Sequence, residues 1–453
     1  MNPPATQGPQ MQFTIYPWDI KSWRLAFRVS GLPGVALFFL VLGAMLQTAD
    51  VSGGGVAGHS SLSALLLVRT PAALLALLVL LSRPRIASIR ITDLRFAYAA
   101  FACWYFASSL WSQGRIQTIG KSTELLLAGL VFLEASRDEH PILRVEALRQ
   151  IVLLTMSTIA TITVLGFVLR ISTFVQPRPG LIGSTTAQAP FLSGNGLGYV
   201  ASALLLLIFA EWQGHRLRGK AAFGQLVFAM ALFSTSASRT SLGILLLSML
   251  LVIFKRSKLF GTLAVSAVVV GFTLFWSEIH AFLEGQTAHS GNMETLSGRT
   301  VVWTAALRLF QEHPVLGVGG GVGGKVVVSH ISNIYISVMS SLHNGFLETL
   351  TGLGLIGFAI GVYMLLLTTW RALGAWNSNP EFAGTYVLII HVWLTTTMST
   401  GVLGWMGYEV ALFLCILTNL DLVRERAQLS ARIRLAPVRW SGLSMIPGDQ
   451  AAG

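Results

Sequence analysis

The stretch GFLETLTGLGLIGFAIGVYMLLLTT, residues 345–369, decides the fold class, because it is almost entirely apolar and carries a single charged side chain, Glu348. A helix needs about 20 mostly apolar residues to cross the hydrocarbon core of a membrane. This stretch is long enough, and largely uncharged runs recur at 31–49, 61–81 and 262–276. We therefore expect an all-α protein that crosses a membrane many times.

The composition of the whole chain leads to the same class. Of its 453 residues, 53% are hydrophobic and only 11% are charged, whereas a soluble domain usually has about 25% charged residues. The net charge of +12 would suggest nucleic-acid binding in a soluble protein. Here basic loops on the cytoplasmic side of a membrane account for it, so we expect membrane lipids and no nucleic acid as partners. Cys103 and Cys415 lie in apolar segments and indicate neither a disulfide nor a metal site.

Twelve apolar segments are expected to span the membrane. They lie near residues 31–49, 62–81, 94–111, 118–135, 148–170, 189–210, 221–235, 240–254, 260–277, 343–369, 384–400 and 404–421. Most of the 31 Lys and Arg residues fall in alternate loops, the pattern typical of loops that stay in the cytoplasm. Both termini are therefore predicted to be cytoplasmic.

This topology divides the chain into five segments. They are a cytoplasmic or interfacial N-terminal segment (1–30), spans one to nine (31–277), a large outer loop (278–342), spans ten to twelve (343–421) and a basic cytoplasmic tail (422–453). An amphipathic helix is predicted at 299–312 in the loop, and Pro314 ends it. We expect its apolar face to lie on the membrane surface or to cap the bundle.

Residues 317–324 in the same loop match the spacing G-x-G-x-x-G at Gly319, Gly321 and Gly324. A dinucleotide site is not expected, because no strand precedes these glycines and they face a compartment without nucleotides. A flexible loop is the simpler interpretation.

Several cations run against the charge bias and suggest a function. Arg115, Arg178, Arg239, Arg299, Arg308 and Lys325 fall on the outer side, and Arg69, Lys121 and Arg170 fall inside or at the ends of spans. Each of them alone could simply reach toward a lipid headgroup. Together they suit an anionic substrate carried on a lipid, because a guanidinium grips phosphate oxygens with two parallel hydrogen bonds. A lipid diphosphate is the natural ligand class.

His343 is the best placed of the nine histidines to act as a general base. It lies where the long loop enters the tenth span, and the partial positive charge of a helix N-terminus favours a neutral imidazole. A capping or interfacial histidine is an equally good interpretation from position alone. Asn344 and Glu348 share a helix face, but the spacing of His343 and Glu348 does not make Glu348 its orienting partner.

Lys121 and Glu124 lie three residues apart on one helix face and are candidates to line a polar cavity, although a simple intrahelical pair is the plainer alternative. No closely spaced acidic pair occurs in any outer loop. This absence weakens a metal-dependent mechanism, since divalent-metal sites usually need clustered carboxylates. No cofactor is expected.

Four stretches together resemble the bacterial superfamily of O-antigen ligases and Wzy-type polymerases, which includes exopolysaccharide polymerases. They are Arg178-Pro179-Gly180 with Ser193-Gly194-Asn195, the turn Ser236-Ala237-Ser238-Arg239, the segment Gly298-Arg299…Trp303…Pro314…Gly317, and His343-Asn344…Gly352-Leu353-Gly354. Each is weak alone. Their order over residues 178–357, with the large loop before the tenth span, makes the resemblance specific.

The resemblance implies a glycosyltransferase of the GT-C type at the periplasmic face of the inner membrane. Such enzymes move a glycan from undecaprenyl diphosphate to an acceptor hydroxyl without a metal or a nucleotide sugar. By motif match, Arg178 and Arg239 would hold the diphosphate, Arg299 would assist them or be structural, and His343 would activate the acceptor. Asn195, Asn344, Lys121 and Glu124 are candidates to line the cavity.

The acceptor distinguishes the two activities of this superfamily. A ligase transfers to the lipid A–core of lipopolysaccharide, and a polymerase transfers to a second lipid-linked repeat unit. The stretch Ser108-Ser109-Leu110-Trp111-Ser112…Thr118…Lys121 resembles exopolysaccharide polymerases slightly more. The alternatives are a transporter or flippase of lipid-linked oligosaccharide, for which no six-plus-six repeat is found, and a structural membrane anchor.

Overall fold

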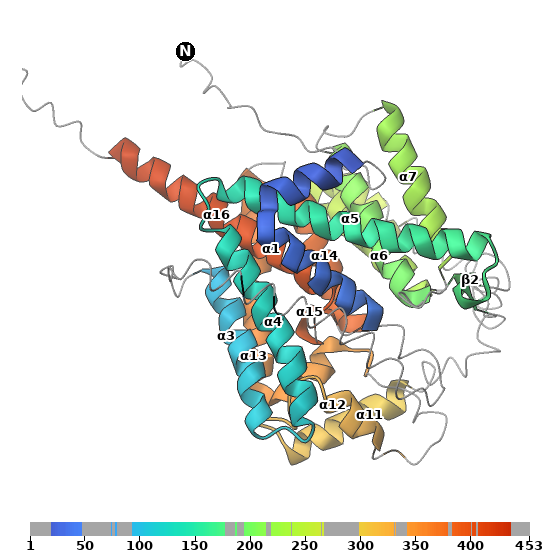
Figure 1. Cartoon of the computed structure of the whole chain (residues 1–453), viewed down its shortest axis with the longest axis vertical. Coiled ribbons are helices and arrows are strands. Elements are labelled where there is room, and N and C mark those ends of the chain that lie inside the picture. The colour runs from blue at the N-terminus through green and yellow to red at the C-terminus, as the bar shows by residue number, and fades with distance from the viewer. Residues whose placement is uncertain are drawn as a thin grey trace, which may run out of the picture.

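The fold is a bundle of apolar helices, seen in a computed structural model of the chain (Figure 1). The structure describes residues 20–47, 74, 78, 93–176, 186–187, 194–213, 219–236, 238–263, 265–266, 299–329, 331, 342–378, 383–399, 401–404 and 406–435. The expected spans near 62–81 and 260–277 fall largely outside these residues, as do most of segment 1–30 and the end of the basic tail.

In the described part of the chain, the helices of the bundle are α1 (Ile20–Gln47), α3 (Leu94–Ala107), α4 (Arg115–Ala135), α5 (Pro141–Val168), α6 (Gly194–Gln213), α7 (Gly219–Ser234), α8 (Arg239–Arg256), α13 (Gly345–Ser378), α14 (Ala383–Met398), α15 (Gly401–Gly404) and α16 (Tyr408–Leu435). Short 3₁₀ turns follow α3 (η1, Ser108–Leu110) and α5 (η2, Ser172–Phe174). Among the described residues, strand structure is limited to one small antiparallel pair, β1 (Val175–Gln176) with β2 (Thr186–Ala187).

The protein is an all-α membrane protein. Among the described residues, four helical stretches are long and apolar enough to cross a membrane, namely Trp23–Leu42, Arg115–Ala135, Pro141–Val168 and Gly345–Asn377. Shorter apolar helices lie at Asn195–Phe209, Phe223–Ser234 and Gly384–Met398. Large apolar side chains such as Phe223, Leu226 and Met230 of α7 face outward. In water these side chains would be unfavourable, whereas lipid tails accommodate them.

The helices α11 (Arg299–Glu312) and α12 (Gly323–Ser329) cover one end of the bundle, where α3 turns into α4 (Figure 1). We call this the capped end. The helix predicted at 299–312 is α11, and its buried residues Val302, Ala306 and Leu309 pack with Val318 and Val322 in a small separate core. The apolar face of α11 therefore caps the bundle.

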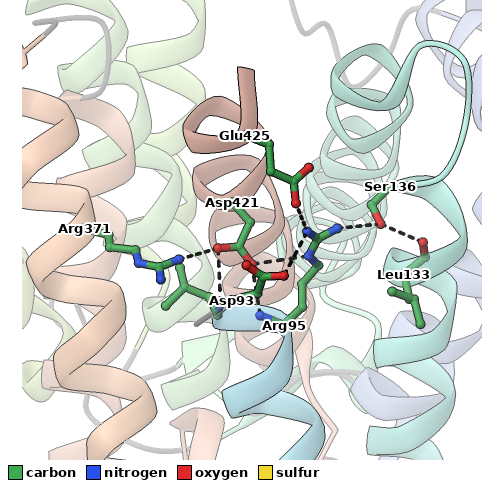
Figure 2. A network of polar contacts seen from close by, with 8 residues as sticks. Asp93, Arg95, Leu133, Ser136, Arg371, Asp421 and Glu425 are labelled. Carbon is green, nitrogen blue, oxygen red and sulfur yellow. Dashed lines mark hydrogen bonds and ion pairs between the residues drawn. The ribbon is translucent and has the colours of Figure 1, made fainter. Parts of the chain in front are cut away.

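The opposite end is held together by Asp421 of α16, whose carboxylate is buried among groups from three helices (Figure 2). It accepts the backbone N–H groups of Leu94 and Arg95 at 3.1 Å each, the first two of α3, and so caps that helix from another part of the chain. It also pairs with the guanidiniums of Arg95 (3.3 Å) and Arg371. Arg95 further contacts Glu425 and Ser136. One carboxylate thus joins α3, α13 and α16.

Replacing Asp421 by alanine is expected to destabilise the protein by about 3–5 kcal/mol, because two partly buried guanidiniums and two helix N–H groups would lose their partner. The measurement is thermal unfolding in detergent micelles. Glu425→Ala is the matched control: this side chain pairs with the same Arg95 but is 47% exposed, so a change below about 1 kcal/mol is expected. Equal effects for both variants would contradict the central role of Asp421.

Candidate active site

The glycine-rich segment 317–324 is not a flexible loop, contrary to the expectation from its sequence. Its residues are buried, and they exchange hydrogen bonds with a break in α13 at Gly354, where φ is +65°. The break leaves the carbonyls of Thr351 and Gly352 without their usual helical donors, and they accept N–H groups from Val318 (3.0 Å) and Gly319 (2.8 Å). In return, the N–H of Leu355 donates to the Pro314 carbonyl at 2.8 Å. Two stretches that carry the family resemblance are therefore in direct contact.

The other side of this segment is bound by η1 and the beginning of α4. Ser108 Oγ accepts the Gly320 N–H at 2.9 Å, Thr118 Oγ1 donates to the Gly320 carbonyl at 2.9 Å, and Lys121 Nζ donates to the Gly321 carbonyl at 2.6 Å. These side chains belong to the stretch of 108–121 that resembles exopolysaccharide polymerases, and they bind the backbone of the glycine-rich segment. These contacts span about 200 residues of sequence, which explains why local spacing did not reveal them.

Gly319 cannot be replaced without a clash. Its φ is +115°, and a β-carbon there would lie 2.1 Å from Ser112 Oγ. Gly319→Ala is expected to lower the free energy of unfolding by more than about 1 kcal/mol. In the control Gly120→Ala, nothing lies within 4 Å of the new carbon. Alanine in a helix is expected to raise the free energy of unfolding by up to about 1 kcal/mol relative to glycine. Thermal unfolding of both variants measures the difference, and a neutral Gly319→Ala would contradict the packing.

His343 lies directly before α13, at the capped end. Its φ is +49°, in the left-handed region that residues with a β-carbon rarely adopt. The next residue, Asn344, caps α13: its Oδ1 accepts the Leu347 N–H at 3.0 Å, and its carbonyl accepts the Glu348 N–H at 2.9 Å. His343 thus stands just outside the helix, at the end where the helix dipole is positive.

Arg299, the first residue of α11, lies close enough to His343 for its charge to act on the imidazole. Burial, together with the Arg299 charge, lowers the pKa of His343 from 6.5 to about 4. The imidazole is therefore neutral at physiological pH and can accept a proton. The positive charge of Arg299 also acts on Tyr199 of α6.

The N-terminus of α8 reaches the same region. Tyr199 hydrogen-bonds with the side chain of Thr240, the second residue of α8, and its hydroxyl donates to the Met398 carbonyl at 3.4 Å. Ser238 caps α8 by accepting the Ser241 N–H at 3.1 Å. Arg239 is the first residue of α8, and its side chain lies outside the described part. The starts of α8, α11 and α13 thus approach one another around Tyr199 and His343.

The remaining sequence-predicted site residues lie in different places. Arg178 falls outside the described residues. Asn195 is exposed near the start of α6, Asn344 is a helix cap, and Lys121 binds the Gly321 carbonyl. Glu124, one turn further along α4, has one carboxylate oxygen in a fully buried position. Lys121 therefore lies beside the glycine-rich segment.

Sequence reasoning missed the part that Glu348 and Trp303 take at this site. Glu348 is 3% exposed and its carboxylate accepts the N–H groups of Gly324 (3.1 Å) and Leu342 (3.3 Å). Trp303 of α11 donates its Nε1–H to the Leu342 carbonyl at 2.9 Å. The sequence did contain one indication for Glu348: it is a carboxylate inside an apolar span, and such ionisable residues are rare and usually functional.

The described residues contain no group of three or more His, Cys, Asp and Glu side chains arranged to hold a metal ion. The two cysteines are both free, Cys103 exposed and Cys415 buried.

Comparison with known proteins gives one family. Residues 221–362, about a third of the chain, match the model of a family described as O-antigen ligase. The matched region runs from α7 through the break in α13 and includes Arg239, Arg299 and His343. No curated protein matches the chain. The resemblance to the O-antigen ligase and Wzy-type polymerase superfamily is therefore confirmed over residues 221–362.

Proposed function

Since residues 221–362 are an O-antigen ligase family region of an all-α membrane protein, we propose that the chain transfers a glycan from undecaprenyl diphosphate to an acceptor hydroxyl. We place the reaction at the periplasmic face of the bacterial inner membrane. The observation that carries this proposal is the position of His343, directly before the cap of α13 and near Arg299 at the start of α11; burial and the Arg299 charge lower the pKa of its imidazole. A base and an anion-binding group are the two elements that such a transfer needs.

The proposed topology is that of a GT-C-type enzyme with twelve spans and both termini in the cytoplasm. Residues 31–277 would hold nine spans and residues 343–421 three more, with the loop 278–342 in the periplasm. The capped end would then face the periplasm, and Asp421 would lie at the cytoplasmic end. This assignment follows from the bias of Lys and Arg toward alternate loops.

In the proposed reaction, the acceptor hydroxyl gives its proton to the imidazole of His343 as its oxygen attacks the anomeric carbon of the donor glycan. The bond between that carbon and the diphosphate oxygen breaks, and undecaprenyl diphosphate leaves with the bonding electron pair. Arg178 and Arg239, with Arg299, would bind the diphosphate and stabilise the negative charge that develops on it. A bound diphosphate would also offset the Arg299 charge and so raise the pKa of His343, which makes the imidazole a stronger base.

The acceptor is either the lipid A–core of lipopolysaccharide or a second lipid-linked repeat unit. The stretch of 108–121 favours a polymerase slightly, although its side chains also serve to bind the glycine-rich segment. Deletion of the gene followed by analysis of surface glycans decides between the two. Long chains that accumulate on the carrier would identify a ligase, and single repeat units alone would identify a polymerase. Normal long chains on the surface would contradict both.

Transfer is expected to be insensitive to chelators. The leaving group is a diphosphate ester, and fixed guanidiniums take the charge-stabilising part that a divalent cation has in other phosphate chemistry. The measurement is transfer by purified protein with and without EDTA, with a magnesium-dependent glycosyltransferase as the control. A strict requirement for added Mg²⁺ or Mn²⁺ would contradict the proposed mechanism.

A further inference from the structure

The backbone of His343 adopts a conformation that must be held by its surroundings. A residue with a β-carbon and φ of +49° is uncommon and persists where neighbouring contacts fix it. The contacts on both sides of His343 therefore show what fixes its backbone and, with it, the direction of its Cα–Cβ bond.

The residue before His343 is held at both of its backbone groups. The Leu342 carbonyl, which belongs to the peptide plane joining Leu342 to His343, accepts the Trp303 Nε1–H at 2.9 Å. The Leu342 N–H donates to Glu348 Oε2 at 3.3 Å. Since φ of His343 is the rotation between this peptide plane and the rest of the residue, fixing the plane restricts φ. On the other side, Asn344 is fixed as the cap of α13.

The two residues that hold Leu342 are themselves anchored. Glu348 is buried, and its other oxygen accepts the Gly324 N–H at 3.1 Å, so its carboxylate joins the entrance of α13 to the glycine-rich segment. Trp303 belongs to α11, the helix that begins at Arg299. One rigid helix thus carries both the cation that acts on His343 and the donor that fixes its backbone.

We infer that Trp303 and Glu348 are positioning residues for His343: acting through the backbone of Leu342, they hold its imidazole toward the reaction site. Their catalytic meaning rests on the function proposed above, whereas their effect on the conformation of His343 does not. The two parts can be tested separately.

The conformational test uses the full-length protein in lipid nanodiscs and diethyl pyrocarbonate, which acylates neutral imidazole. Mass spectrometry follows acylation at His343 in wild type, Trp303→Phe and Glu348→Gln. Phenylalanine keeps an aromatic ring but lacks the N–H donor. Glutamine keeps one acceptor oxygen, so one of the two backbone N–H groups loses its partner. Trp104→Phe is the matched control, because Trp104 is also partly buried and donates to a carbonyl of α13, that of Leu353 at 3.3 Å.

Trp303→Phe and Glu348→Gln are expected to raise the acylation rate at His343 about five- to tenfold, the change that one lost hydrogen bond produces in an opening equilibrium. In wild type, acylation should persist as the pH falls toward 4. In both variants its midpoint should move toward the ordinary value for histidine. Trp104→Phe should change neither quantity. Unchanged rates and midpoints in both variants would overturn the inference.

Surface glycans of a deletion strain complemented with the same variants give the catalytic test. Trp303→Phe is expected to slow the appearance of long chains about 10- to 100-fold, as small misplacements of a reacting group do, at normal protein levels. Faster acylation with undiminished glycan transfer would support the positioning of His343 by Trp303 and Glu348. It would refute only the proposed role of His343 as the base. Unchanged acylation with lost transfer would refute the positioning and leave the proposed function standing.

Discussion

His343→Ala is expected to lower glycan transfer about 10²- to 10⁴-fold, the usual contribution of a general base. Because the imidazole lies outside α13 and its neighbour Asn344 provides the cap, the variant should still fold and insert. Alanine removes the imidazole that accepts the proton but keeps the β-carbon, so the backbone strain at φ of +49° is the same in the variant as in the wild type. The measurement is the amount of long-chain surface glycan in a deletion strain that expresses the variant.

His313→Ala is the matched control. His313 lies at the same end of the bundle, between α11 and Pro314, and its side chain is exposed while its backbone makes the turn. Its removal should leave transfer unchanged. Full complementation by His343→Ala would refute the catalytic assignment and favour a transporter or flippase of lipid-linked oligosaccharide.

Helix positions were largely predictable because apolar length alone determines them. The segments expected at 118–135, 148–170 and 343–369 correspond to α4, α5 and α13, and the amphipathic pattern at 299–312 gave both ends of α11. The break at Gly354 was not predicted. Its cause is the neighbouring segment, since the hydrogen bonds lost by α13 are made with Pro314, Val318 and Gly319.

The glycine-rich segment shows why composition misled the sequence interpretation. Glycine permits flexibility, but it also permits close approach of two backbones and positive φ. Gly317, Gly319 and Gly321 all have positive φ, and β-carbons there would lie 2.1–2.5 Å from neighbouring atoms. The partners belong to α3, the α3–α4 turn, α4 and α13, so only the packed structure distinguishes a rigid segment from a mobile one.

The part of Glu348 was missed for a similar reason. Helical spacing correctly indicated that Glu348 and Asn344 share a face, and it gave no reason to pair Glu348 with the His343 ring. The carboxylate binds the backbone of Leu342 and Gly324 instead. Backbone donors have no signature in a single sequence, which is why such a link is invisible to motif reasoning.

Arg239→Lys is expected to lower transfer about 100-fold, because a lysine point charge does not replace the two-pronged hydrogen bonding of a guanidinium to phosphate. The position of Arg239 strengthens the expectation. It is the first residue of α8, whose N-terminus carries partial positive charge and is capped by Ser238. A diphosphate bound there would interact with both the side chain and the helix dipole. Lysine keeps the positive charge but lacks the paired N–H donors of the guanidinium.

Arg308→Lys is the control, since Arg308 is exposed on α11, away from the buried face of that helix. Complementation and protein level are measured for both variants in the same strain. If Arg239→Lys supported near-normal transfer, the diphosphate-binding role of Arg239 would be wrong, because charge alone would then be sufficient. If Arg308→Lys were equally impaired, a general effect of arginine loss would replace a specific one. Impairment at Arg239 alone would assign the start of α8, where Thr240 meets Tyr199, to the diphosphate.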